Sequence, residues 1–225
     1  MDKVMRIAVF DVCDTLYRAN TSFAFLDSYF SNNRKYRLFR RLSRSLPGKL
    51  ISYPFFRWMK FDLVRILATR FLAGEDVRKI ENVSREFVFN QLVTKINPET
   101  ETLLRELKEK GYKIVLMSGS FGFIVSHVTA YFDADDFFAS ELASSGGRLT
   151  GKFRADQLYT KKGRLESVYP QIEELVVVSD NKTDLELLKM ADEAYIVCNK
   201  KRDLVFWQEQ FSDSPKVRYL ETYDE

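Results

Sequence analysis

The chain has few of the residues that build disulfide-bonded or histidine-based sites. Its 225 residues include two cysteines and a single histidine. Cys13 and Cys198 lie far apart, so they form neither a disulfide framework nor the close spacing of a metal-binding pair. Such cysteine usage is typical of a reducing compartment. We expect His127, the one histidine, to pack in a helix and not to act as a catalytic base.

Long apolar segments and low-complexity linkers are also absent from the sequence. No apolar run reaches the length of about 20 residues that a membrane-spanning helix needs. The first five residues lead into an apolar strand and carry no signal-peptide pattern, so we expect a cytoplasmic protein. With 45% hydrophobic and 30% charged residues, the composition is typical of a folded globular protein. The length suits one domain with a modest insertion.

Three apolar runs rich in β-branched residues predict buried strands. They cover residues 6–10, 113–117 and 175–178. Between the first two runs, Asn97 and Pro98 are typical of a helix start. Strands that alternate with helices predict an α/β protein with a parallel sheet. Polar residues follow each run directly, and such sheets bind ligands at the carboxyl ends of their strands.

The first strand run ends in the most specific motif of the chain. Residues 10–16 read Phe-Asp-Val-Cys-Asp-Thr-Leu. This segment resembles the first motif of the haloacid dehalogenase (HAD) superfamily, which is Asp-x-Asp-x-Thr after a hydrophobic strand. Asp11, Thr15 and Leu16 match that motif, whereas Cys13 stands where the second aspartate is expected.

Three further segments resemble the other motifs of the superfamily, in the right order. Ser118 follows the second strand run, as the Ser or Thr of the second motif does. Asp180 and Asp184, four apart after the third run, match the fourth motif. Lys161 has the spacing of the third-motif lysine in the phosphoserine-phosphatase-like branch, with the adjacent Lys162 as the alternative. On these four motifs the chain is identified as a member of the superfamily.

The resemblance implies a Rossmann-like parallel sheet with an inserted α-helical cap. We expect the core to comprise residues 1–19 and 97–225. Residues 20–96 show helical patterning and little β signal, and the family inserts a cap over the active site at this point. Such a cap closes over bound substrate and excludes water.

The resemblance also implies a Mg²⁺-dependent phosphatase that forms an aspartyl-phosphate. Asp11 is the expected nucleophile. A carboxylate that faces a phosphate needs a cation to offset the repulsion, and hard Mg²⁺ prefers oxygen ligands. The expected ligands are the side chains of Asp11 and Asp180 and the backbone carbonyl of Cys13. Asp184 is expected to support the metal shell or to hold Lys161.

The transferred phosphoryl group is expected to lie at the end of the second strand run. Ser118 and the backbone N–H of Gly119 would hold its oxygens, helped by the amino end of a helix that starts near Phe121. Lys161 would balance the charge of Asp11 and of the phosphate. The expected substrate is a small phosphomonoester, and a phosphosugar or a phospholipid phosphate at a membrane surface is the alternative.

Because Cys13 replaces the expected aspartate, the sequence leaves open which reaction the chain performs. In the phosphatases of the family the second aspartate protonates the leaving alcohol and then activates water. General acid–base catalysis of this kind raises the reaction rate about 10²–10⁴-fold. A thiol with an ordinary pKa of about 8.5 is a poor substitute. Asp14 is one residue along, and we expect it to point elsewhere unless the loop geometry turns it inward. The chain is then a slower phosphatase, an enzyme for acidic leaving groups, a domain with a long-lived phosphoaspartate, or a silent domain that binds a phosphorylated ligand or partner.

Positive charge is concentrated in residues 31–70. This segment holds eleven Lys/Arg and one acidic residue, Asp62, whereas the whole chain has a net charge of +3. A helical wheel of residues 34–46 places arginines on one arc, namely Arg34, Arg37, Arg40, Arg41 and Arg44. It places apolar residues on another arc, namely Tyr36, Leu38, Phe39, Leu42 and Leu46.

Two interpretations of this segment stay open. We favour a cap helix with a solvated basic face above an aromatic core, because runs of charge are usually solvated. The other interpretation is a peripheral contact of helix 34–46 with a membrane surface, next to an aromatic run at residues 53–61. No nucleic-acid-binding module is visible, so nucleic acid is not an expected partner. The oligomeric state is not predicted.

Overall fold

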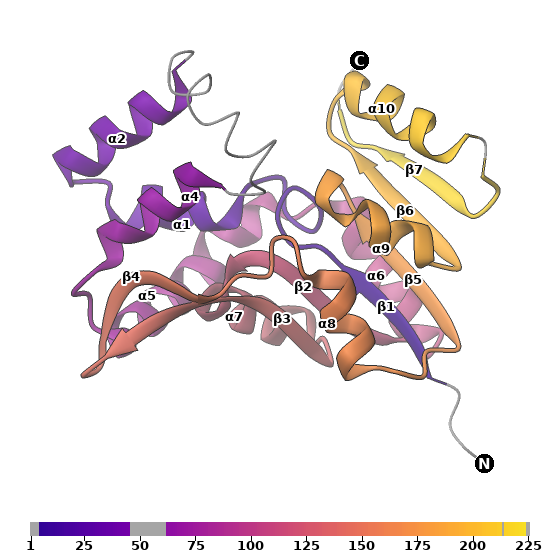
Figure 1. Ribbon diagram of the computed structural model, residues 1–225, viewed down its shortest axis with the longest axis horizontal. Coiled ribbons are helices and arrows are strands. Elements are labelled where there is room, and N and C mark those ends of the chain that lie inside the picture. Colours follow the sequence, from indigo (N-terminus) through magenta and orange to yellow (C-terminus); the bar gives the residue numbers. More distant parts are fainter. Residues whose placement is uncertain (1–4, 46–61, 213, 224–225) are drawn as a thin grey trace.

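The computed structural model describes residues 5–45, 62–212 and 214–223, and Figure 1 shows their arrangement. The chain folds around one seven-stranded sheet with the order β4-β3-β2-β1-β5-β6-β7. In chain order the strands are β1 (Arg6–Phe10), β2 (Lys113–Phe121), β3 (Asp136–Ser145), β4 (Arg148–Ala155), β5 (Glu174–Ser179), β6 (Glu193–Cys198) and β7 (Val217–Glu221). β3 and β4 pair antiparallel, and the other neighbouring strands pair in parallel. The predicted α/β class with a mostly parallel sheet is confirmed.

Helices cover both faces of the sheet (Figure 1). On one face lie α6 (Pro98–Glu109) and α7 (Gly122–Phe132). On the other face lie α8 (Lys161–Val168), the short turn η3 (Lys182–Asp184), α9 (Leu185–Met190) and α10 (Lys201–Phe211). This two-sided cover explains why the strand runs are apolar at successive positions and not only at alternate ones.

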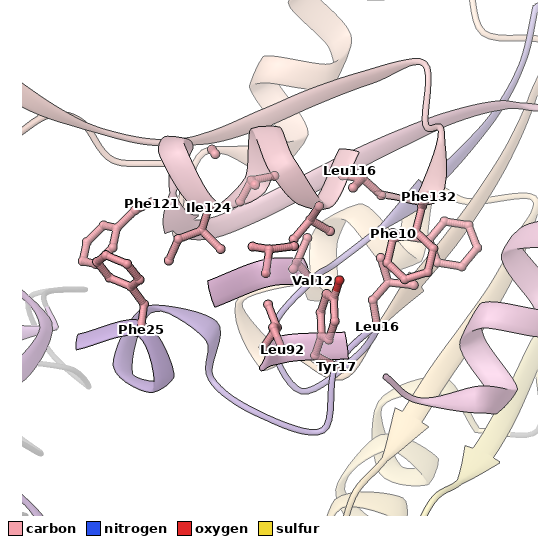
Figure 2. Close-up of a cluster of buried hydrophobic side chains, with 14 of the residues drawn as sticks. Phe10, Val12, Leu16, Tyr17, Phe25, Leu92, Leu116, Phe121, Ile124 and Phe132 are labelled. Atoms are coloured by element: carbon pink, nitrogen blue, oxygen red, sulfur yellow. The ribbon is translucent and has the colours of Figure 1, made fainter. Parts of the chain in front are cut away.

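The side chains of β1 show how the core is divided. Ala8 and Phe10 belong to the hydrophobic cluster under α6 and α7, whereas Ile7 and Val9 belong to the cluster under α8, α9 and α10. Figure 2 shows part of the first cluster, in which the ring of Tyr17 lies 5.9 Å from that of Phe132 in α7. β1 is therefore buried on both faces and lies at the centre of the sheet.

Between β1 and β2, every regular element that the structure describes is a helix. Before α6, these elements are α1 (Thr21–Tyr29), α2 (Arg34–Arg44), α4 (Leu63–Thr69), η1 (Arg70–Leu72), α5 (Val77–Asn90) and η2 (Leu92–Lys95). Phe25 of α1 lies with its ring 5.5 Å from that of Phe87 in α5 and 5.3 Å from that of Phe123 in α7. The aromatic run at residues 53–61 and Leu46 fall outside the described residues. Within the described ranges, no helix has both the length and the apolarity to cross a bilayer.

The structure divides the apolar arc of α2. Tyr36 is buried, whereas Leu38 and Leu42 are 59% and 58% exposed. The reason is a carboxylate on α1: Asp27 accepts hydrogen bonds from the Tyr36 hydroxyl and from Arg40 Nε, both at 2.7 Å. These polar bonds turn the side of α2 that carries Tyr36 and Arg40 inward, and the leucines are left on the outer side.

Candidate active site

The carboxyl ends of β1, β2 and β5 meet at one edge of the sheet. Phe10 pairs with Leu116 of β2 on one side and with Val178 of β5 on the other. The backbone N–H of Asp11 donates to the carbonyl of Val178 at 2.9 Å. The residues that follow these strands therefore lie close together, as the pattern of strands and helices predicts.

Asp11, Lys161 and Asp184 form a buried charged group at this edge. Asp11 Oδ1 lies 3.1 Å from Lys161 Nζ and accepts the backbone N–H of Val12 at 2.7 Å. Lys161 Nζ also donates to Asp184 Oδ2 at 2.6 Å. The three side chains are each no more than 3% exposed. Of the two lysines considered, the structure brings Lys161 to Asp11, whereas Lys162 is exposed.

Hydroxyl groups join the loops that follow β1 and β5. Thr15 Oγ1 donates to Asp180 Oδ1 at 2.9 Å and accepts the backbone N–H of Asp180 at 3.0 Å. Ser179 Oγ donates to Asp184 Oδ2 at 2.7 Å. The motif threonine, matched in the sequence without a role, is thus the residue that binds the two loops to each other. Asp184 contacts Lys161, which is one of the two tasks expected of it.

Ser118 and Cys13 also meet at this edge. Ser118 is fully buried, and its Oγ accepts the backbone N–H of Ser120 at 3.1 Å. Cys13 Sγ lies 4.0 Å from Ser118 Oγ and 3.1 Å from Thr21 Oγ1. A register shift between β2 and β3 covers Ser118 to Phe121 and leads into α7, which begins at Gly122.

A cavity of about 200 Å³ opens beside these residues. The sheet and its loops line it with Cys13, Asp14, Gly119, Ser120, Leu158, Asp180 and Asn181. The helical segment between β1 and β2 lines it with Asn20, Ser22, Asp62 and Arg65. The cavity thus lies between the strand ends and the helices of residues 20–96.

Asp14 lines this cavity because its backbone is left-handed, with φ at 53°. Aspartate is one of the few residues that take this conformation readily. The Asp14 carbonyl accepts from Asn199 Nδ2 at 2.8 Å, which supports the turn. Of the two orientations considered for Asp14, the loop geometry gives the inward one.

The site carries more negative than positive charge. Burial raises the pKa of Asp11 to about 6, although the charge of Lys161 acts in the opposite direction. Burial, followed by the charges of Asp11 and Asp14, raises the pKa of Asp180 well above its ordinary value. Burial disfavours the Lys161 ammonium, but the charges of Asp11 and Asp184 outweigh it and raise the pKa of that lysine.

The Cys13 thiol is neutral at physiological pH. Burial and the charge of Asp11 raise its pKa to about 11, and hydrogen bonds from Thr21 offset only part of that shift. A neutral thiol neither accepts a proton from water nor attracts a cation strongly. The thiol therefore fills space between Ser118 and α1 and adds no charge to the cavity.

The carboxylates at this edge suit Mg²⁺ more than they suit a metal ion that needs several side-chain ligands. Within the described ranges, no group of three or more His, Cys, Asp or Glu side chains is arranged to hold a metal ion. Mg²⁺ does not need such a group, because it keeps several waters and is usually bound through one or two carboxylates. Asp11 and Asp180 supply two carboxylates, and the charge of Asp11 raises the pKa of Asp180. A divalent cation between them would relieve that repulsion.

Arg65 is the main site residue that the sequence did not reveal. Its side chain is 6% exposed, and its guanidinium donates to the Gly119 carbonyl and to Asp156. The guanidinium also lies 4.5 Å from the centre of the Phe153 ring. Among the described residues, its Nε finds no hydrogen-bond partner. In the sequence Arg65 is one of eleven cations in a basic segment, and no motif marks it.

The sheet order, the buried Asp11–Lys161–Asp184 group and the cavity beside Ser118 describe an α/β protein with a polar ligand site at the carboxyl ends of its parallel strands. The chain belongs to the haloacid dehalogenase-like hydrolases, whose family model matches residues 8–189. Its relatives include phosphoserine phosphatases. That of Methanocaldococcus jannaschii is 27% identical over 124 residues, which cover 46% of this chain and 58% of that protein. That of Archaeoglobus fulgidus is 27% identical over 130 residues, which cover 54% of this chain and 35% of that protein.

Other similarities extend over more of the chain. Protein CicA of Caulobacter vibrioides is 29% identical over 152 residues, which cover 66% of this chain and 68% of that protein. A structure of a phospho-aspartyl intermediate analogue of phosphoserine phosphatase is 20% identical with a TM-score of 0.64, over 99% of this chain and 96% of that one. A Bordetella pertussis protein of unknown function has a TM-score of 0.76 at 15% identity, over 97% and 99% of the two chains. These structural similarities support the fold.

Proposed function

We propose that the chain is a Mg²⁺-dependent phosphatase that hydrolyses a small phosphomonoester through a phosphoaspartate at Asp11. The observation that carries this proposal is the buried contact of Asp11 with Lys161, at the edge where Ser118 and Asp180 also lie. A buried carboxylate held beside a lysine and next to a polar cavity is suited to attack phosphorus. The phosphoserine phosphatases among its relatives agree with this class of reaction.

The first step is an attack by a carboxylate oxygen of Asp11 on phosphorus. The new bond joins that oxygen to phosphorus while the bond from phosphorus to the alcohol oxygen breaks. Lys161 offsets the negative charge that gathers between Asp11 and the phosphoryl group. Ser118 Oγ and the backbone N–H of Gly119 would donate to the phosphoryl oxygens.

The second step is hydrolysis of the phosphoaspartate, which returns Asp11 and releases inorganic phosphate. In sum, one ester and one water give one alcohol and one phosphate. Bound Mg²⁺ would neutralise the phosphoryl oxygens and oppose the repulsion between phosphate and carboxylate. The side chains of Asp11 and Asp180 and the carbonyl of Cys13 would hold the ion.

The helical segment serves as a cap in this proposal. Residues 20–96 form the cap, and residues 1–19 and 97–225 form the core. Asn20, Ser22, Asp62 and Arg65 line the cavity from the cap. Closure of such a segment over a substrate keeps bulk water away from the reacting groups.

Cys13 shapes the rate in this proposal, since it stands where the acid–base aspartate of the family is expected. With a pKa of about 11, the thiol does not activate water at neutral pH. We therefore expect the enzyme to prefer esters whose alcohol leaves without protonation. The same neutral thiol favours a second candidate function, which is a domain that binds a phosphorylated ligand or partner in this cavity without turnover.

The test is incubation of the purified chain with Mg²⁺ and a panel of alkyl and aryl phosphomonoesters. We expect phosphate release that needs Mg²⁺ and that is lost in Asp11→Asn. Acid quenching followed by mass spectrometry should detect phosphate on Asp11 in the unsubstituted chain. Absence of both turnover and a trapped phosphoenzyme, together with saturable binding of phosphate esters, would leave only the binding function.

A further inference from the structure

The outer face of α2 combines exposed leucines with exposed cations. Leu38 is 59% exposed and Leu42 is 58% exposed, one turn apart on the same face. The exposed cations around them are Arg34, Lys35, Arg37, Arg41 and Arg44. α2 lies at the outer end of the molecule, away from the sheet (Figure 1).

Contacts on the inner face keep the leucines outside. Asp27 of α1 accepts from the Tyr36 hydroxyl at 2.7 Å, from Arg40 at 2.7 and 3.0 Å and from Arg44 at 2.8 Å. The Tyr36 ring lies 5.3 Å from the ring of Phe71. Rotation of α2 to bury Leu38 and Leu42 would break all of these bonds. The outward leucines are thus a fixed feature of this fold.

The positive charge on the outer side is largely unpaired. Within residues 5–45, 62–212 and 214–223, no carboxylate pairs with Arg34, Lys35, Arg37 or Arg41. Next to this outer side, a hollow of about 620 Å³ lies where α2 meets Asp27 of α1, and four arginines line it, Arg37, Arg40, Arg41 and Arg44. Arg40 and Arg44 are paired with Asp27 there. The unpaired cations of α2 attract anions.

We propose that α2 docks on a bilayer that contains anionic lipid, with Leu38 and Leu42 inserted below the headgroups. A helix that lies in an interface has an apolar strip flanked by cations on its polar sides, and α2 presents both. Arginine and lysine reach sideways to headgroup phosphates while their stems stay in the apolar layer. The positive charge of α2 favours a bilayer with anionic lipid over a neutral one. The two exposed leucines favour a bilayer, which has an apolar interior, over a dissolved anion.

The experiment is flotation of the full chain with vesicles of phosphatidylcholine alone or with phosphatidylglycerol added. Two variants test the two halves of the surface: Leu38→Ser/Leu42→Ser and Arg37→Glu/Arg41→Glu. Matched controls come from α10, where Val205 is 55% exposed and Lys201 and Arg202 are exposed. These controls are Val205→Ser and Lys201→Glu/Arg202→Glu. The far-ultraviolet circular dichroism and the thermal unfolding of each variant, with vesicles absent, check that it is folded.

We expect binding to vesicles with phosphatidylglycerol, weak or no binding to phosphatidylcholine, and a steady loss with added salt. The arginine variant should bind about a hundredfold more weakly, and the leucine variant at least about tenfold more weakly. The α10 controls should bind like the unsubstituted chain. No binding to anionic vesicles at low salt would overturn the proposal. So would an equal loss in the Lys201→Glu/Arg202→Glu control, which would show a general charge effect.

Discussion

Replacement of Cys13 by aspartate tests how this chain handles protons. The thiol lies 3.1 Å from Thr21 Oγ1 and 4.0 Å from Ser118 Oγ, at the wall of the cavity. An aspartate there would find one donor ready, the backbone N–H of Thr21, which now contacts the sulfur at 3.3 Å. We expect Cys13→Asp to fold and to place a carboxylate where a leaving alcohol departs.

The size of the expected gain follows from the pKa of the thiol. With a pKa of about 11, roughly one Cys13 in 10⁴ is a thiolate at pH 7, so its contribution as a base is negligible. General acid–base catalysis raises the reaction rate about 10²–10⁴-fold. We therefore expect kcat/KM for an alkyl phosphate to rise about a hundredfold or more. An aryl phosphate with an acidic leaving group should gain much less, because its alcohol departs without a proton.

The assay compares kcat/KM for glycerol phosphate and for nitrophenyl phosphate at saturating Mg²⁺. Cys13→Ser is the matched control, since a hydroxyl keeps the contact with Thr21 and supplies no acid or base near neutral pH. That variant should leave both substrates close to their original rates. Equal gains on the two substrates, or a loss on both, would refute the reasoning about proton transfer at Cys13.

Four other expectations concern the charged groups of the site. Lys161→Met should lower the free energy of unfolding by about 3–5 kcal/mol, because it leaves buried carboxylates without their cation. Lys162 is exposed, so Lys162→Met should change that free energy by less than about 0.5 kcal/mol. Chemical denaturation measures both, and similar effects would contradict the assignment of Lys161 as the site lysine. Mg²⁺ affinity should fall as pH drops through about 6, because the pKa of Asp11 is raised to about 6, that of Asp180 is also raised, and both must lose protons to bind the ion. The test is the rise in melting temperature that added Mg²⁺ causes at pH 5 and at pH 7.5. An equal rise at the two pH values would refute this expectation. In the metal-free chain the contribution of Asp11 to stability should fall as pH rises from about 4 to about 6, since the native state keeps a proton that the unfolded chain releases. Arg65→Met should lower the free energy of unfolding by about 2–3 kcal/mol and lower kcat, because it removes charged hydrogen bonds. Arg65→Lys should restore part of each loss. Unchanged unfolding and turnover in the methionine variant would show that Arg65 is dispensable.

The sheet and the strand-end residues could be predicted because they depend on local pattern. Apolar runs of the length of a buried strand are visible in the sequence, and parallel strands place their carboxyl ends at one edge. The closeness of Asp11, Ser118 and Asp180 follows from that geometry alone. The preference for Lys161 over Lys162 depends on a spacing to Leu165 that resembles the third motif of the family, and not on geometry.

The features that were missed depend on contacts between distant elements. The helical wheel of α2 gives two arcs but not the side that faces the core, which Asp27 on another helix decides. Arg65 reaches Gly119 and Asp156 only after α4 packs on β4, and its position in a basic run hides this contact. The inward turn of Asp14 rests on a left-handed backbone that no residue pattern shows. Side-chain orientation is a tertiary property.

The double hydrogen bond between Thr15 and Asp180 has a consequence for how a ligand reaches the cavity. Because Thr15 both gives and receives a hydrogen bond, the loops that follow β1 and β5 are held together at two points. We therefore expect these loops to move little when a ligand enters. Any opening of the cavity would then come from the segment that contributes Asn20, Ser22, Asp62 and Arg65.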